Sequence, residues 1–166
     1  MKKIWIAFVL TCSSAAQALT FEQLNDQGLD LKILKTVQKP AGITVTYQFA
    51  FPASRSGEVQ TFTAEVRALP ASKQIADLRL TDVKNLPAHQ SEAVFGVLLR
   101  MSSLCMGFAP SAVSLDFMQQ IAASQKTTLK FNKTYGKVQV SYVLNRGKLT
   151  QLRYLNPKPA KSNCTL

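Results

Sequence analysis

The chain has 166 residues, about the length of one ordinary domain, and 46% of them are hydrophobic, which excludes a largely disordered protein. Its 20 Lys and Arg outnumber its 9 Asp and Glu, so the formal net charge is +11 and an acidic partner is favoured over a basic one. No apolar run approaches the roughly 20 residues that a membrane-spanning helix needs, so we expect no such helix.

The first 18 residues have the pattern of a signal peptide. Lys2 and Lys3 give a positive start, residues 4–10 form an uninterrupted apolar run, and residues 16–18 (Ala-Gln-Ala) place small side chains where a signal peptidase cleaves. We therefore expect cleavage after Ala18. The leader is of bacterial type, which predicts that the mature protein, residues 19–166, is periplasmic or secreted.

Two other interpretations of the leader are open. The apolar run alone would also fit a buried N-terminal helix. A lipoprotein signal would end at Cys12, but Thr11 before it is larger than the residue that such signals prefer. The signal peptide accounts for the order of charge, apolar run and small residues, so it is our working interpretation.

A short helix and four strands are predicted after the leader. Thr20 and Gln23 have the spacing of a capping box, so we expect a helix over residues 20–25 that ends at Gly28. Alternating apolar residues then predict strands over residues 31–37, 43–51, 59–68 and 75–83. Turn-forming residues, including the loop at 52–57, separate these strands, which indicates an antiparallel four-strand meander.

Two helices are predicted in the middle of the chain. Ser91 is placed to cap the first, over residues 91–106, and Gly107 to end it. Apolar side chains cover most of this helix, as is typical of a helix buried on most sides. Pro110 begins the second helix, whose apolar residues recur every four positions: Val113, Phe117 and Ile121.

The last third of the chain returns to strands. Alternation predicts three of them, near residues 129–131, 138–142 and 152–154, with turns at 132–137 and 145–148, and the tail from Asn156 has no pattern. We therefore predict an α+β fold in a single domain. Its antiparallel sheet, in one or two sections, would comprise a four-strand meander and a three-strand meander, with two central helices between them in the chain.

Two cysteines remain once the leader is removed. In an exported protein, Cys105 and Cys164 are most simply interpreted as one structural disulfide, which would tie the C-terminal tail back to the first central helix. The alternative is a reactive or metal-binding thiol. Metal sites need several Cys and His ligands close together, whereas this chain has a single histidine, His89.

The positive charge is concentrated near the C-terminus. Residues 19–116 contain nine basic and nine acidic residues, whereas residues 117–166 contain nine basic residues and no acidic ones. We expect six of these basic residues to form one positive, partner-binding surface: Lys130, Lys133, Lys137, Arg146, Lys148 and Arg153. A basic face that serves only solubility is the alternative.

No catalytic motif is present in the sequence. The phosphate-binding loop, the glycine-rich dinucleotide motif, the serine nucleophile elbow and the zinc-ligand spacings are all missing. His89 has no neighbouring pair of residues that would make it the base of a nucleophilic site. We therefore expect no cofactor, no metal and no enzymatic activity, and a small hydrolase with an unfamiliar site is the alternative.

These patterns favour a non-enzymatic binding or accessory protein that engages an acidic protein or a polyanion through its basic C-terminal strands. The same charge fits a second hypothesis, a protein that binds nucleic acid or the anionic envelope, through lipopolysaccharide or lipid. Sequence-specific recognition of nucleic acid is not expected, because Tyr142 and Tyr154 fall on apolar faces and only Tyr135 lies in a turn.

Overall fold

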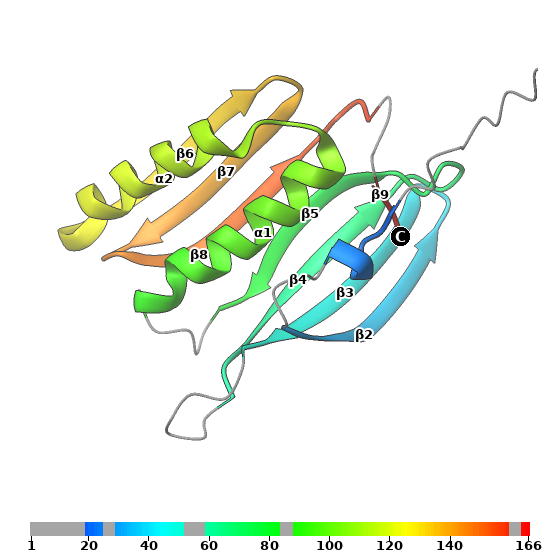
Figure 1. Cartoon of the computed structure of the whole chain (residues 1–166), viewed down its shortest axis with the longest axis horizontal. Coiled ribbons are helices and arrows are strands. Elements are labelled where there is room, and N and C mark those ends of the chain that lie inside the picture. Colours follow the sequence, from blue (N-terminus) through cyan, green and yellow to red (C-terminus); the bar gives the residue numbers. More distant parts are fainter. Residues whose placement is uncertain (1–18, 25–28, 52–58, 84–87, 160–163) are drawn as a thin grey trace, which may run out of the picture.

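A computed structural model of the chain describes residues 19–24, 29–51, 59–83, 88–159 and 164–166. The predicted signal peptide, the helix end at Gly28 and the loop at 52–57 lie outside these residues. The described part has two layers, a seven-stranded antiparallel sheet and two helices on one of its faces (Figure 1). The predicted α+β fold, with two helices between two meanders in the chain, is confirmed.

The sheet consists of two meanders that meet at one seam. The first contains β2 (Asp30–Lys39), β3 (Gly42–Ala50), β4 (Thr61–Ala68) and β5 (Ile75–Asp82), and the second contains β6 (Thr128–Tyr135), β7 (Val138–Asn145) and β8 (Lys148–Leu155). The strand order β2-β3-β4-β5-β8-β7-β6 makes them one continuous sheet. Only three residue pairs join β5 to β8, namely Asp77–Leu155, Leu78–Tyr154 and Arg79–Arg153. The two strands are therefore paired over only part of their length.

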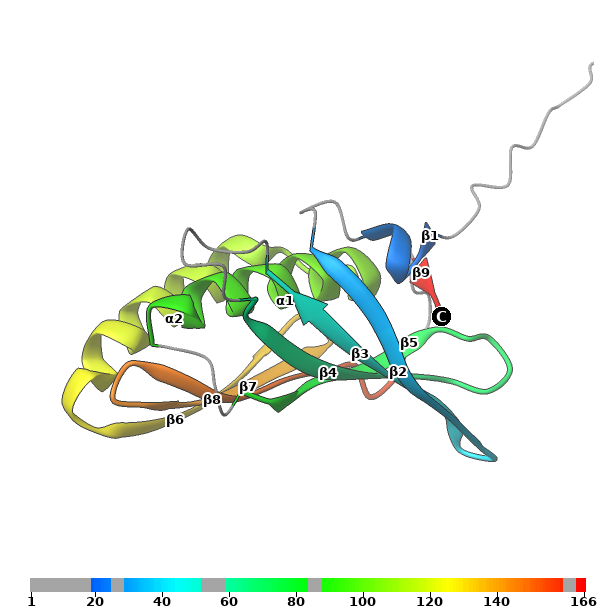
Figure 2. The ribbon, with the colours of Figure 1, turned by 90° about the horizontal axis from the view of Figure 1, so that it is seen from below.

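Both helices lie on the same side of the sheet (Figure 2). The first, α1 (Ser91–Met106), packs against β5 and β8 and so covers the seam, and the second, α2 (Pro110–Ala123), packs against β7. A helix over the centre of a sheet needs a wide apolar face, and α1 supplies it by burying most of its side chains. Successive side chains of a strand point to opposite faces of the sheet, so every second residue points to the face that the helices do not cover.

Aromatic rings connect the two helices to the second meander. Phe95 of α1 stacks on Phe117 of α2 with ring centroids 3.6 Å apart, and the ring of Tyr142 on β7 meets both of them edge-on. Phe131 on β6 stacks on Tyr142, with ring centroids 4.5 Å apart. Such contacts add to the stabilisation from apolar burial, so this cluster fixes the helices on the sheet.

The two ends of the described chain lie together. The backbone nitrogen of Thr20 donates to Gln23 Oε1 at 2.8 Å, and the nitrogen of Gln23 donates to Thr20 Oγ1 at 3.4 Å, which is the predicted capping box. The helix that follows is a single 3-10 turn, Glu22–Leu24, and is shorter than predicted within the described residues. Strand β1 (Leu19–Thr20) pairs in parallel with β9 (Cys164–Thr165).

The predicted disulfide is present between Cys105 and Cys164, whose Cα atoms are 4.9 Å apart. Both cysteines are buried, and the bridge fastens β9 to the last turn of α1. A buried disulfide at this place is compatible with an oxidising, exported location.

Ser91 does not cap α1 as predicted. It is the first residue of the helix, and its Oγ accepts a hydrogen bond from the backbone nitrogen of Leu149 at 2.9 Å. The hydroxyl therefore links α1 to β8. Gly107 ends the helix in the left-handed conformation, at φ 69°, as its position predicted.

The turns of the second meander are shorter than the sequence indicated. The predicted turn at 132–137 is wrong over most of its length, because β6 keeps pairing with β7 as far as Tyr135 and only Gly136 and Lys137 remain between the strands. Between β7 and β8, Arg146 and Gly147 have φ values of 50° and 72°, which agrees with the positive φ expected there.

Candidate functional site

The sheet face turned away from α1 and α2 is called the open face here. Alternation along each strand gives it polar side chains from six neighbouring strands, since the residues between them are buried on the other side of the sheet. Its central residues are Thr46 on β3, Glu65 and Arg67 on β4, Asp77, Arg79 and Thr81 on β5, Gln151 and Arg153 on β8, Gln139 and Ser141 on β7, and Lys130 and Asn132 on β6.

Two arginines face each other across the seam. Arg79 on β5 pairs in register with Arg153 on β8. Like charges directly opposite each other destabilise a sheet unless other groups offset them. Each guanidinium here is bound by a carboxylate on the side of the first meander, Glu65 for Arg79 and Asp77 for Arg153.

Hydrogen bonds hold both guanidinium groups in fixed positions. Arg153 donates from Nε and Nη2 to the two oxygens of Asp77, at 2.9 and 2.7 Å, and this carboxylate raises the pKa of Arg153 above its usual range. Arg79 donates from Nε and Nη2 to Glu65 Oε2. The Nη1 group of each arginine makes no hydrogen bond with any described residue, so its two N–H donors remain available.

A shallow hollow of about 450 Å³ lies beside these arginines, where β5 and β8 are no longer paired. The side chains of Arg79, Arg153, Lys130, Ser141 and Gln151 contribute to its lining. Lys130 has no carboxylate within ion-pair distance among the described residues, and its side chain extends from the edge strand β6. We call this feature the face hollow, and it brings three cations together with hydroxyl and amide groups.

Of the six basic residues predicted to form one surface, the structure places Lys130 and Arg153 on the open face. Lys133 lies on the helix side instead, because it pairs with the buried Val140. Its ammonium group is 2.8 Å from Asp116 Oδ2 on α2. Lys133 therefore forms its ion pair on the helix side and is not part of the open face.

The other three predicted residues are separated from one another. Lys137 lies in the turn between β6 and β7, whereas Arg146 and Lys148 lie at the turn between β7 and β8. The eight residues of β7 stand between these turns, a distance of roughly 25 Å at about 3.3 Å per residue. The six residues are thus divided into a pair on the open face, one lysine on the helix side and two groups at separate turns.

Arg79 was missed by the sequence interpretation, together with Glu65 and Asp77. The charges of residues 19–116 sum to zero, so this region gave no signal in a count by segment. The sequence did contain a signal for these residues. Glu65 and Arg67 stand two positions apart on β4, as Asp77 and Arg79 do on β5, so each pair belongs on one face of the sheet.

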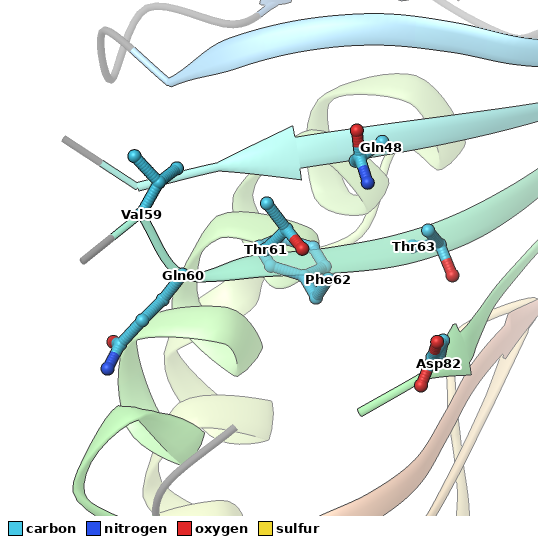
Figure 3. A pocket seen from close by; sticks show the side chains of 7 residues that line it. All are labelled: Gln48, Val59, Gln60, Thr61, Phe62, Thr63 and Asp82. Carbon is cyan, nitrogen blue, oxygen red and sulfur yellow. The ribbon is translucent and has the colours of Figure 1, made fainter. Parts of the chain in front are cut away.

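A second hollow on the open face has a different character. It measures about 370 Å³ and is formed by Gln48 on β3, residues 59–63 and Asp82 at the end of β5 (Figure 3). Gln60 also lines this hollow, but its side chain points away from Thr61 and Thr63, and its buried Oε1 has no hydrogen-bond partner among the described residues. Amides, hydroxyls and one carboxylate would not attract an anion, so we do not assign the acidic partner to this hollow.

Tyr135 is not free in a turn, as the sequence interpretation had placed it. It ends β6, and its hydroxyl donates to Asp116 Oδ2 beside Lys133. Partial burial and this bond raise the pKa of Tyr135 above its usual range. Tyr142 and Tyr154 are buried in the core as predicted, so none of these three rings stands on the open face.

The described residues contain no group of three or more His, Cys, Asp or Glu that would hold a metal ion. His89 lies in the 3-10 turn Ala88–Gln90 that precedes α1.

No model of a known protein family matches the chain, and no curated protein or solved structure matches it. Among the described helices, none has the length and apolarity needed to cross a membrane. The candidate site therefore rests on geometry and charge alone.

Proposed function

We propose that this is an exported, non-enzymatic binding or accessory protein that engages an acidic macromolecule on its open face, centred on the face hollow. The observation that carries the proposal is the arrangement of Arg79 and Arg153, which are anchored by carboxylates and line the hollow together with Lys130. Four N–H donors of the two Nη1 groups and one ammonium group are available there for carboxylate or phosphate oxygens.

The anchored arginines are suited to binding because they are already ordered. A flexible cation loses side-chain entropy when it binds an anion, and a guanidinium held by two hydrogen bonds has lost much of it on folding. The hydroxyl and amide groups around the hollow, such as Ser141 and Gln151, would extend recognition across the strands. A partner with an extended acidic segment would use several of them together.

The mixture of charges favours an acidic protein over a nucleic acid. Glu65, Asp77 and Asp82 stand among the cations of the open face. These carboxylates would repel a continuous line of phosphates. An acidic protein can instead place single carboxylates next to the cations and away from the carboxylates of the open face. Sequence-specific reading of bases is not part of the proposal, since the open face presents no aromatic ladder in its described part.

The proposal is tested by titrating the protein with a fluorescent deca-glutamate peptide. Lys130→Glu should weaken binding by tenfold or more, and should weaken retention on heparin as well. Lys126→Glu is the matched control, because it makes the same charge change at an exposed lysine outside the open face and should change the affinity less than threefold. Equal effects of the two variants would show that only net charge matters and would contradict the proposed site.

A second titration separates the two classes of partner. The account predicts tighter binding of the peptide than of duplex DNA at the same ionic strength. Tighter binding of DNA, with a steep dependence on salt, would favour the nucleic-acid hypothesis instead.

A further inference from the structure

A separate hollow lies on the helix side of the molecule, where three chain segments meet. It has a volume of about 680 Å³, within the range of about 300–1,000 Å³ usual for small-molecule sites. Its walls are the turn between α1 and α2, the turn between β6 and β7, and Asn156 after β8. Figure 1 shows these two turns at the same end of the sheet. We call this feature the turn hollow.

One wall of the turn hollow is apolar. Met106, Phe108 and Val138 line it, and Met106 and Val138 also belong to the buried core. Gly107 and Gly136 add backbone without side chains, and a Cβ at either glycine would meet no atom within 4 Å. The hollow is therefore open at these positions and has room for an apolar group.

The opposite side of the turn hollow offers donors for an anion. Helix α2 begins there, with Ala109 at its N-cap position, no side-chain cap and no acidic residue in its first turn. The first backbone N–H groups of a 14-residue helix without a side-chain acceptor favour a negative charge nearby.

Asn156 supplies a further polar side chain to the wall of the turn hollow. It lines the turn hollow and is only 4% exposed. Its Oδ1 accepts from the backbone nitrogen of Lys158 at 3.3 Å, and its own backbone nitrogen donates to Ala76 O at 2.8 Å. The side-chain nitrogen makes no hydrogen bond with any described residue. This nitrogen is not one of the buried polar atoms that lack a partner, so it is accessible and can donate to a ligand oxygen.

The charge of the turn hollow is positive. Lys137 lines it from the turn between β6 and β7, and no acidic residue is among its lining residues. The wall residue Tyr135 donates to the carboxylate of Asp116, which Lys133 also binds. An incoming anion would thus meet one cation, one side-chain amide and the start of a helix.

We propose that the turn hollow binds a small amphipathic carboxylate of the fatty-acid type. Its carboxylate would lie at the start of α2, between Lys137 and the side-chain nitrogen of Asn156. Its alkyl chain would lie along Met106, Phe108 and Val138. The carboxylate matches the donor side of the hollow and the alkyl chain matches the apolar wall. Neither a small anion nor a purely apolar molecule would match both sides. The turn hollow lies on the helix side and does not include the open face, so this site is independent of the function proposed above.

The test is calorimetric titration of the protein with decanoate, with Ala109→Asp as the first variant. Ala109 is exposed and has the extended backbone of an N-cap residue, so an aspartate there would cap α2 and place a carboxylate on the free N–H groups. This variant should have an equal or higher Tm and should bind decanoate at least tenfold more weakly. A merely structural effect would lower both the Tm and the affinity.

Lys137→Gln is the second variant and should weaken decanoate binding roughly tenfold, since it removes a charge-assisted contact. The control Lys126→Gln makes the same change elsewhere and should leave the affinity unchanged. Decanol and acetate should each bind much more weakly than decanoate. The proposal is overturned if decanoate does not bind at millimolar concentration, if decanol binds equally well, or if both hollow variants bind decanoate like the unmodified protein.

Discussion

Arg79 and Arg153 lie directly opposite each other on β5 and β8, and the carboxylates of Glu65 and Asp77 hold them in place. The pair stands at the seam, where only three residue pairs join the two meanders. Asp77 is 6% exposed and also lies 4.0 Å from Arg67, so it is the most buried charge on the open face. The same groups thus stabilise the joined sheet and form the candidate site.

Removal of the charge of Asp77 should separate these two roles. Asp77→Asn weakens the hydrogen bonds to Arg153, so we expect the free energy of unfolding to fall by about 1–3 kcal/mol, measured by urea titration. Affinity for the deca-glutamate peptide should rise several-fold, because two guanidinium groups lose a neutralising charge. Glu92→Gln is the control, since it removes an exposed carboxylate on α1 and should change both quantities little. Unchanged or weaker peptide binding by Asp77→Asn would contradict this role of the arginines.

The disulfide should contribute strongly to stability. It closes a loop with a sequence separation of 59, for which chain entropy gives an upper value of about 4 kcal/mol. Replacement of both Cys105 and Cys164 by alanine should therefore lower the free energy of unfolding by about 2–4 kcal/mol. The measurement is urea unfolding of the oxidised protein and of the double variant. A thiol assay that finds two free cysteines in the unmodified protein would contradict the bridge itself.

Phe117 should be one of the costliest core residues to truncate. It is 1% exposed and stacks on Phe95, so Phe117→Ala should lower the free energy of unfolding by about 3–5 kcal/mol. Leu115 on the same helix is 60% exposed, and Leu115→Ala should change stability by less than about 0.5 kcal/mol. Thermal or urea unfolding of the two variants compares them directly, and similar losses would mean that α2 packs on the sheet by another face.

The contact between α2 and β6 should depend on pH. Hydrogen bonds from Lys133 and then from Tyr135 hold the pKa of Asp116 below its usual range. Because the pKa is lower in the folded state, the ionised carboxylate stabilises the fold above the unfolded-state value of about 4. This contribution is lost as the pH falls through the folded-state pKa.

Asp116→Asn tests this dependence. The variant should be less stable than the unmodified protein at pH 7, and the difference should shrink as the pH falls from about 5 toward 2, followed by urea midpoints at each pH. A difference that stays constant over this range would show that the Asp116 carboxylate does not contribute through its ionisation.

Local patterns predicted the elements of this fold well. The alternation from Ile43 to Phe51 marks β3, the apolar residues of 91–106 mark α1, and the capping box at Thr20 is formed. These features depend on spacing within one segment, which a sequence displays directly. The disulfide was predictable for a different reason, since only one pair of cysteines follows the predicted signal peptide.

The candidate site was less predictable because it depends on which strands become neighbours. The pairing of β5 with β8 brings Asp77 to Arg153, 76 residues away in the chain, and no local pattern encodes this contact. The position of Asp116 beside Lys133 likewise depends on how α2 lies over the sheet. The alternation of β6 did predict one of these positions. Lys133 is two residues after the core-facing Phe131, so its side chain belongs on the helix side of the sheet.

Binding of an acidic partner at the face hollow is measured most directly by titrating the isotope-labelled protein with deca-glutamate and following the amide NMR shifts. We expect the largest shifts on β5, β7 and β8 around Arg79, Ser141 and Arg153. Shifts confined to Lys137, or to Arg146 and Lys148, would place the anion at a turn and would contradict the account.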